Sequence, residues 1–415
     1  MKMKSHSLEL PRIFTGIVGL YILSYILPSG ELFGMPVQKM VVILLLGMAW
    51  IFFVKEKKIV AIIKKSKLEI VVAVAGGLGL LYSVFMGNNL GIMFAGLLYI
   101  NVFVFFTIVH LIDLNMIEKT ALVYMILGMI SIKMVEKIVV ELMFVSGQID
   151  YDGVSQLYFS IFNTEATTMT MNFGSVELVR IQNASDTIVF LLLPFFLLMP
   201  QVSNKVKAGL LVLYSIFSMI VFSRLYLLLY CGFQFVFFIY YRKKISWKVW
   251  GITGGVFILS AFFWLKPFAS MIAFRFFSSF AAESDSVRWI QAKELLEGIR
   301  RHLWFGNGMG SYIEDYIRNI NIPFAYELEY LSFIYQLGII GFVCVITGII
   351  CIYIKHFLPI LKGKELLIMK FVTVLCFFWL WIRPFFNPSF LGLQNGFPLI
   401  GMYLIDKAWL ETKGC

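Results

Sequence analysis

Arginine and lysine are distributed differently along the chain. The sequence holds ten arginines and twenty-five lysines. Lysine dominates short stretches such as 55–67 and 242–248, whereas eight arginines lie elsewhere: Arg180, Arg224, Arg275, Arg288, Arg300, Arg301, Arg318 and Arg383. A guanidinium group pairs with two phosphate oxygens at once and gives up its water more readily than an ammonium group. The arginines therefore predict a site for a phosphate or pyrophosphate anion.

A purely structural alternative stays open for many of these arginines. Arg275, Arg300, Arg301 and Arg318 can form loop salt bridges with acids such as Asp285, Glu294 and Glu297. That explanation is weaker for Arg180 and Arg224, which have no adjacent acidic residue in the sequence.

Two carboxylates and several aromatic residues could act on a substrate beside this anion. Glu327 and Glu329 stand in the sequence Tyr-Glu-Leu-Glu-Tyr, directly before a long apolar run. A carboxylate here could accept a proton from an attacking hydroxyl, or it could simply favour the N-terminus of a helix. Tyr326, Tyr330 and Trp304 offer flat apolar faces for sugar rings, although aromatic residues also mark membrane interfaces.

A helix over 287–304 is expected to position Arg288. Ala292, Leu295, Leu296, Ile299 and Leu303 recur at helical spacing, and Gln291, Glu294, Gly298 and Arg301 are expected on the opposite face. Arg288 then falls in the first turn, where the helix dipole favours an anion. The following Gly306-Asn307-Gly308-Met309-Gly310 follows no strand, so it predicts a tight turn rather than a dinucleotide-binding loop.

Composition excludes a soluble protein. The 415 residues are 60% hydrophobic and only 14% charged, with a net charge of +11 and a mean hydropathy of +0.86. Soluble domains carry about 25% charged residues. The sequence therefore predicts an all-α polytopic membrane protein forming one membrane domain over 1–415, and its positive charge is attributed to membrane orientation rather than nucleic acid.

Apolar runs and their charged borders predict about twelve transmembrane helices with both termini inside. The expected spans are 13–29, 37–54, 68–86, 90–111, 119–145, 186–200, 208–223, 225–241, 249–265, 327–354, 366–382 and 389–406. Four lysine-rich loops then fall on the inner side. Two long outer segments, about 146–185 and 266–326, are predicted to form a helical outer region.

Some charged residues fall inside the expected spans, and the outer segments contain residue types that can bind metals. The fifth span carries Lys133, Glu136 and Lys137, which are costly in lipid and indicate either a surface, the bundle interior or a polar cavity. The five cysteines predict no disulfides, and the outer His, Asp and Glu residues show no metal-ligand spacing, so neither a metal nor a cofactor is expected.

The order of several motifs resembles the O-antigen polymerase and ligase superfamily. An arginine-bearing amphipathic helix precedes "FGNGMGSY" and, about fifteen residues later, "YELEYLSFIYQLGIIG". "SRLYLLLY" around Arg224, "VRIQNASD" around Arg180 and "NPSFLGLQNG" near the end resemble further segments of that superfamily. The resemblance covers roughly 175–400.

The resemblance implies a polymerase of the Wzy type in the bacterial cytoplasmic (inner) membrane. Its substrates would be undecaprenyl-pyrophosphate-linked oligosaccharides, with membrane lipids, a chain-length regulator and a flippase as further partners. Arg180, Arg224 and Arg288 would stabilise the departing pyrophosphate, and Glu327 would serve as base. Substrate contacts would come from Arg275, Arg300, Arg301, Tyr326, Glu329, Tyr330 and Trp304.

Two alternatives remain. The ligase branch carries a histidine and a small polar residue where this chain has Glu327 and Leu328, which favours the polymerase. A lipid-linked oligosaccharide flippase would fit twelve spans equally well, but such transporters commonly show internal repeats, and none is visible here.

Overall fold

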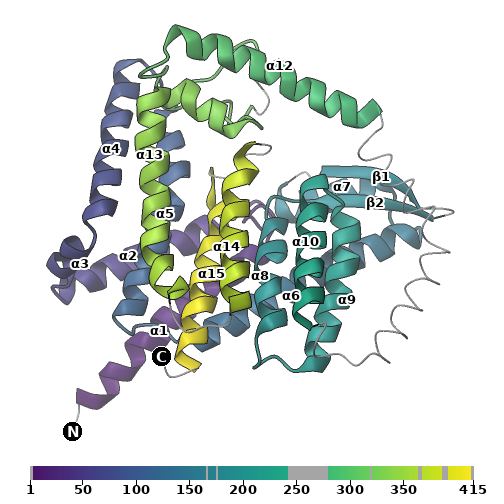
Figure 1. Cartoon of the computed structure of the whole chain (residues 1–415), viewed down its shortest axis with the longest axis horizontal. Helices are drawn as coiled ribbons and strands as arrows, with labels where there is room; N and C mark the ends of the chain where they lie inside the picture. Colours follow the sequence, from purple (N-terminus) through teal and green to yellow (C-terminus); the bar gives the residue numbers. More distant parts are fainter. Residues whose placement is uncertain are drawn as a thin grey trace. The chain divides into compact units, whose positions relative to one another are not determined.

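The computed structural model describes residues 3–164, 167–173, 176–241, 279–317, 320–362, 367–385 and 391–412. These residues are mostly helical (Figure 1). The chain divides into two compact units, one comprising Met1–Leu23, Gln38–Met125 and Ser286–Cys415, the other Ser24–Val37 and Ile126–Asp285.

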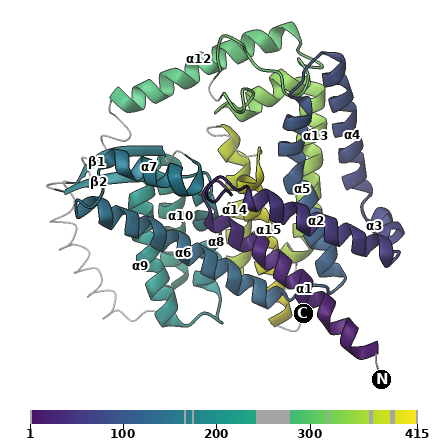
Figure 2. The same ribbon diagram turned by 180° about the vertical axis from the view of Figure 1, so that it is seen from behind.

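The first unit is built from long helices around α4, α5 and α13. Both ribbon views show these three side by side (Figures 1 and 2). Its helices are α1 (Met3–Leu23), α2 (Val37–Lys55), α3 (Ile59–Lys65), α4 (Lys67–Phe85), α5 (Gly91–Asp113), most of α12 (Ser279–Arg301), α13 (Glu329–Leu361), α14 (Leu367–Ile382) and α15 (Leu393–Thr412). The short turn η2 (Arg383–Phe385) follows α14.

The second unit combines helices with one β-hairpin. It holds η1 (Ser24–Ile26), most of α6 (Lys119–Val145), α7 (Tyr151–Phe162), β1 (Thr167–Phe173), β2 (Val176–Gln182), α8 (Asp186–Leu198), α9 (Asn204–Val221) and α10 (Arg224–Tyr241).

The helices fit a polytopic membrane protein. Within the described residues, seven helices are long and apolar enough to cross a membrane. They are Glu9–Ile26, Val37–Lys55, Lys67–Phe85, Gly91–Asp113, Asn204–Val221, Glu329–Leu361 and Leu367–Phe385. Every expected span inside the described ranges overlaps a helix, and the expected span 249–265 lies outside them. Twelve spans, their orientation and a single membrane domain stay predictions.

Two helices show opposite ways of placing apolar side chains. On α4, large hydrophobic residues such as Val71, Val74, Leu78 and Leu81 are exposed at spacings of three and four, so they form one face suited to lipid. Every residue of α8 is buried. A helix that is apolar all round belongs inside a protein core, and α8 is accordingly covered by its neighbours.

The segment 146–185, predicted to be an outer loop, is not wholly helical, which corrects the all-α expectation. β1 and β2 form an antiparallel hairpin in which Met169 pairs with Arg180 and Thr168 with Ile181. The sequence from Val176 to Gln182 does not alternate strictly between apolar and polar residues, since Leu178 and Val179 are adjacent, so its pattern does not predict a strand. The long windows suited to membrane helices do not detect a seven-residue strand.

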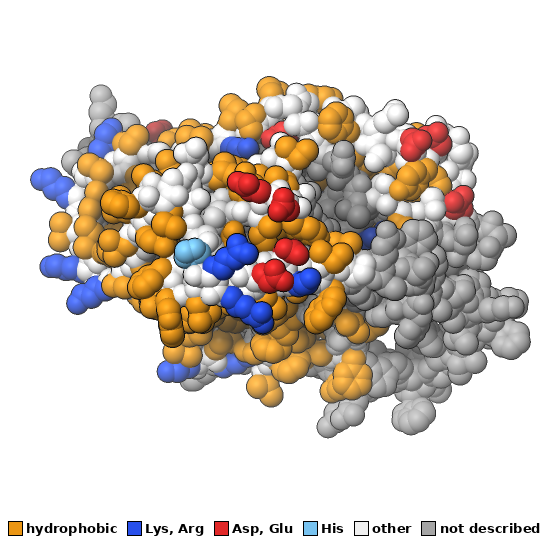
Figure 3. All heavy atoms as spheres, turned by 90° about the horizontal axis from the view of Figure 1, so that it is seen from above, with side chains coloured by type: hydrophobic (Ala, Val, Ile, Leu, Met, Phe, Trp, Pro, Cys, Tyr) orange, Lys and Arg blue, Asp and Glu red, His pale blue; other side chains and the backbone are white. Residues whose placement is uncertain are grey.

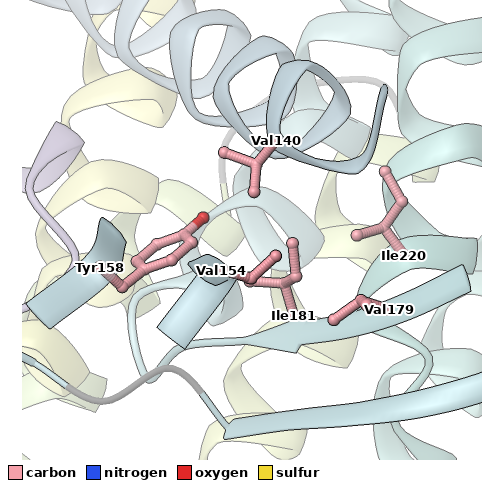
Figure 4. Packing of buried hydrophobic residues seen from close by; sticks show 6 residues of the cluster. All are labelled: Val140, Val154, Tyr158, Val179, Ile181 and Ile220. Carbon is pink, nitrogen blue, oxygen red and sulfur yellow. The ribbon is translucent and has the colours of Figure 1, made fainter. Parts of the chain in front are cut away.

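The hairpin is stabilised by packing against three helices. Figure 4 shows Val179 and Ile181 of β2 pointing toward Val140 of α6, Val154 of α7 and Ile220 of α9, and all of these are buried. The backbone N–H of Val179 also donates to Oε1 of Glu141 at 2.9 Å. A two-stranded hairpin alone is marginal in water, so this cluster is what fixes its position.

Helix α13 is interrupted at Gly338. This residue has φ 66° and ψ 176°, so the chain leaves the helical conformation and re-enters it. The backbone groups released by the break bind segment 303–308 instead. The N–H of Ile339 donates to Leu303 O, and the carbonyls of Tyr335 and Gln336 accept from the N–H groups of Asn307 and Gly308, each at 2.9 Å.

The glycine-rich turn 306–310 therefore has a structural role, because its backbone binds the broken helix α13. The N–H of Met309 donates to Ser83 Oγ, and that of Gly310 donates to Gln336 Oε1 at 2.8 Å. A Cβ at Gly306 would lie 2.4 Å from the nitrogen of Gly338. The predicted close approach is confirmed, and the partner is the broken helix. The N–H groups of residues 306–310 bind protein acceptors, so the turn has no phosphate cradle.

Replacing Gly338 by alanine is expected to destabilise the first unit. A Cβ there would lie 2.3 Å from Trp304 O, and the positive φ adds strain of about 1–3 kcal/mol. The melting temperature in detergent should fall relative to the parent protein. Gly96→Ala is the control, because a Cβ on this helical glycine meets open space. Equal melting temperatures for the two variants would contradict the structural role of Gly338.

Candidate functional site

Helix α12 binds the segment that leads into α13 through two side chains. Arg288 donates through Nε to Glu327 Oε2 at 2.7 Å, and Gln291 Oε1 accepts from the N–H of Leu328 at 2.9 Å. The pair joins residues 39 positions apart in the sequence. Two sequence-predicted residues, the candidate anion ligand and the candidate base, thus meet directly.

This ion pair is partly accessible. The side chains of Arg288 and Glu327 are 24% and 15% exposed. A charge-assisted hydrogen bond in such a position is stronger than one between neutral groups. Because the pair is not sealed in a core, an incoming anion could compete with Glu327 for the guanidinium group, which would free the carboxylate for a second partner.

The buried face of α12 differs from the predicted one. Gln291, Leu295 and Ile299 are buried, whereas Leu296 and Leu303 are exposed. Gln291 is turned inward because its amide receives the Leu328 N–H. Gly298 also faces the unit, where a Cβ would lie 2.4 Å from the ring of Tyr335. Leu295 and Ile299 are thus buried as the apolar spacing predicts, whereas Gln291 was predicted on the opposite face. Because α12 begins at Ser279, Arg288 does not lie in its first turn, and that prediction is wrong.

Glu329 and Tyr330 hold the start of α13 against neighbouring segments. Glu329 is buried, and its Oε1 accepts from the N–H of Leu391 at 3.2 Å. Tyr330 donates through its hydroxyl to Trp381 O at 2.6 Å. These contacts favour a structural role for Glu329, whereas Tyr330 keeps one ring face on a groove described below.

Tyr326 is buried in the segment that connects α12 and α13. Its hydroxyl accepts from the N–H of Ile313 at 2.8 Å, and its ring stacks on Tyr316 with centroids 6.4 Å apart. Burial raises the pKa of Tyr326 to about 12, since the phenolate would be poorly solvated. This arrangement favours a structural role and leaves Trp304, which is exposed, better placed to meet a sugar.

Two of the other arginines that were predicted to contact the substrate lie at the C-terminal end of α12. Arg300 and Arg301 are exposed in the last turn of α12, where they also complement the helix dipole. Figure 3 shows charged side chains of both signs gathered on the face that α12 crosses, among hydrophobic ones. Arg275 and Arg318 lie outside the described residues.

Arg180 belongs to the second unit and is tied to the α9–α10 turn. It is only 6% exposed, donates through Nε to Val221 O at 3.1 Å and also bonds Gln182 Oε1. Val221 ends α9, and Arg224 begins α10 three residues later. The arrangement links Arg180 to the turn that carries the second candidate arginine, whose own side chain lies outside the described set.

A buried charge network lies next to Arg180. Lys137 donates to Asp186 Oδ2 at 2.7 Å and to Ile181 O at 2.8 Å, and both charged side chains are fully buried. Lys133 donates to Ser185 Oγ at 2.8 Å. Asp186 Oδ2 also accepts the N–H of Asn183 at 2.7 Å. The two lysines of α6 therefore lie in the interior of the unit, where they fix the chain that follows Arg180.

The sequence named Arg288, Glu327 and Lys137 as candidates, but it did not indicate that Arg288 contacts Glu327, that Gln291 is buried, or that Asp186 is the partner of Lys137. The two lysines on α6 were the available signal, because such charges in an apolar segment require partners. Convergence of Arg180, Arg224 and Arg288 on one anion stays a prediction. Among the described residues, no group of three or more His, Cys, Asp or Glu could hold a metal ion, and metal independence itself is untested.

Comparison with known proteins adds one finding. The family model described as O-antigen ligase matches residues 209–346, about a third of the chain. The match includes Arg224, Arg288, Glu327 and Gly338, whereas Arg180 lies before it. This match supports the O-antigen ligase and polymerase superfamily. It does not separate the two branches, whose members catalyse glycosyl transfer in polysaccharide biosynthesis. No curated protein matches the chain.

Breaking the buried pair is expected to be costly. Lys137→Met leaves Asp186 without its cation in the interior, which should lower the free energy of unfolding by about 3–5 kcal/mol. The double variant Lys137→Met with Asp186→Asn should recover part of the loss, because no buried charge remains. Thermal unfolding of purified protein measures both. Lys205→Met, at an exposed position on α9, is the control, and a drop as large as that of Lys137→Met would contradict this account.

Proposed function

We propose that the protein is a polymerase that joins undecaprenyl-pyrophosphate-linked oligosaccharide repeat units on the outer face of the bacterial cytoplasmic membrane. The observation that carries the proposal is the contact between Arg288 and Glu327 inside the segment matched by the O-antigen ligase family. It combines an anion-binding group with a proton acceptor at the start of an apolar helix.

The proposed reaction is a displacement at an anomeric carbon. A hydroxyl of the acceptor repeat unit attacks C1 of the donor sugar, a new C–O bond forms, and the bond from C1 to the pyrophosphate breaks. The electron pair of the broken bond leaves with undecaprenyl pyrophosphate. The hydroxyl proton passes to the Glu327 carboxylate. Negative charge grows on the leaving group, so fixed guanidinium groups stabilise the transition state.

The Arg288–Glu327 pair suggests how binding and base formation are connected. Without substrate, the carboxylate neutralises the guanidinium group. A pyrophosphate that binds Arg288 would take over this role, and Glu327 could then orient the acceptor hydroxyl. Arg180 and Arg224 are proposed as further ligands of the same anion, because the Arg180 guanidinium already contacts the turn that carries Arg224.

A ligase is the second candidate, because the matching family model carries that description. It would transfer a finished glycan to a lipid A-core sugar. The two activities can be separated by complementation in strains that lack one or the other. A strain without polymerase displays single repeat units, whereas a strain without ligase displays none. Restored long chains in the first strain would support the polymerase, and rescue of the second strain alone would overturn it.

Arg288→Lys is expected to reduce polymerisation roughly ten- to hundred-fold, since a lysine cannot reproduce two-point phosphate binding worth about 1.5–3 kcal/mol. Polymer length from a purified lipid-linked repeat unit measures the loss, and Arg224→Lys should behave similarly. Arg12→Lys, in the N-terminal part of α1, is the matched control. Full activity of both Arg288→Lys and Arg224→Lys at normal expression would remove pyrophosphate recognition from these residues.

Glu327→Gln is expected to lower turnover by roughly two to four orders of magnitude while the lipid-linked substrate still binds. The amide keeps the shape of the side chain but does not accept a proton. Turnover and substrate binding should be measured separately on the same preparation. Glu314→Gln, an exposed acid in the same outer segment, controls for loss of charge alone. Unchanged turnover in Glu327→Gln would reduce Glu327 to a helix-terminus residue.

A further inference from the structure

An apolar groove of about 520 Å³ follows helix α13 in the first unit. Its lining includes Leu328, which directly precedes α13, together with Tyr330, Ile334, Phe342 and Ile346 of α13 and Phe385 of η2. The lining surface is almost wholly carbon. The volume lies within the ~300–1,000 Å³ typical of small-ligand sites. A groove of this composition suits a hydrocarbon ligand.

The walls of the groove are fixed by packing and by one hydrogen bond. The ring of Tyr330 meets Phe385 with centroids 4.6 Å apart and Phe342 at 5.8 Å, both edge-on. The hydroxyl of Tyr330 is held by Trp381 O at 2.6 Å. A ligand would therefore enter a largely pre-formed site and lose little affinity to ordering the protein.

The groove passes the interruption in α13. Ile334 lies before Gly338 and Phe342 after it, so both halves of the broken helix contribute lining residues. Tyr330 and Phe342 stand on opposite sides of the break, yet the centroids of their rings are only 5.8 Å apart. The break thus brings both halves of the helix to one short groove, which has room for a short apolar segment of a ligand.

One end of the groove adjoins the candidate reaction site. Leu328 is a lining residue, and its own N–H is bound by Gln291 of α12. The preceding residue is Glu327, which accepts from Arg288 at 2.7 Å. A ligand with a long apolar chain in the groove and an anionic group at its end could therefore bring that group to Arg288.

We propose that this groove binds the isoprene units nearest the pyrophosphate of the polyprenyl-linked substrate. The inference rests on the proposed function and assigns the lipid part of the same substrate. An isoprenoid is a single chain that carries its pyrophosphate directly, which matches one groove next to one arginine. Its flat double bonds and methyl branches fit the rigid edges of Tyr330, Phe342 and Phe385. A phospholipid carries two chains joined by glycerol and fits this arrangement less well.

Photo-crosslinking in nanodiscs tests the assignment without requiring turnover. The probe is a polyprenyl pyrophosphate with a photoreactive group on its first isoprene units. We expect crosslinked peptides that contain Ile334 or Phe342, with competition by undecaprenyl phosphate but not by phosphatidylglycerol. Crosslinks elsewhere, or equal competition by phosphatidylglycerol, would overturn the proposal and leave the groove as a site for bulk lipid.

The assignment can also be tested by comparing a variant that fills the groove with a variant outside its lining. Ile334→Trp should lower crosslinking roughly tenfold, whereas Val343→Trp, at an exposed position on α13 outside the lining, should leave it unchanged. If Ile334→Trp does not fold, Phe385→Ala removes an exposed wall and should also weaken crosslinking. Equal crosslinking in a folded lining variant and in Val343→Trp would overturn the assignment.

Measurements of polymerisation activity distinguish a failure of this inference from a failure of the proposed function. With the full-length chain, Ile334→Trp should raise KM, and a ten-carbon prenyl carrier should show the same effect, because it keeps the isoprene units nearest the pyrophosphate. Specific crosslinking in the groove without any polymer from wild-type protein would keep the polyprenyl site and reject the polymerase. Polymer formation with equal KM values for Ile334→Trp and Val343→Trp would keep the polymerase and reject the groove.

Discussion

The first unit depends on how the backbone of α13 is satisfied where its helix is broken. In a membrane protein, peptide groups without partners cost several kcal/mol, because lipid offers no hydrogen bonds. The break at Gly338 releases carbonyl and N–H groups, and segment 303–308 provides the matching donors and acceptors. These hydrogen bonds fix the position of the chain that follows α12. Since α12 carries Arg288, the same backbone contacts set the position of the ion pair with Glu327.

The ion pairs of the two units differ in how far their side chains are exposed. In the second unit, Lys137 and Asp186 are fully buried and bind each other, and their further bonds hold both ends of the segment that follows Arg180. In the first unit, Arg288 and Glu327 are partly exposed and bridge two elements at the edge of a groove. The buried pair has no room to exchange partners and serves the fold. The partly exposed pair could exchange its partner, as the proposed binding of the substrate would require.

The sequence allowed prediction of features with a simple period or a local cause. Apolar runs located the helices, and glycines located the turn at 306–310. Features that depend on distant partners could not be predicted. Gln291 was placed on the polar face of α12, but the N–H of Leu328 draws it inward. The hairpin at 167–182 was missed because each strand has only seven residues and is stabilised by contacts with α6, α7 and α9. The Arg288–Glu327 contact depends on the fold of the whole first unit.

The buried lysines of α6 also set an order for biogenesis. Lys137 is synthesised 49 residues before Asp186, and Lys133 is synthesised 52 residues before Ser185. Until α8 emerges from the ribosome, α6 carries two ammonium groups that lipid solvates poorly. If α6 crosses the membrane as the sequence predicts, the insertion machinery would have to retain it, or leave it at the water interface, until its later partner arrives. Maturation of this region would then proceed by delayed pairing of two segments rather than by release of one helix at a time.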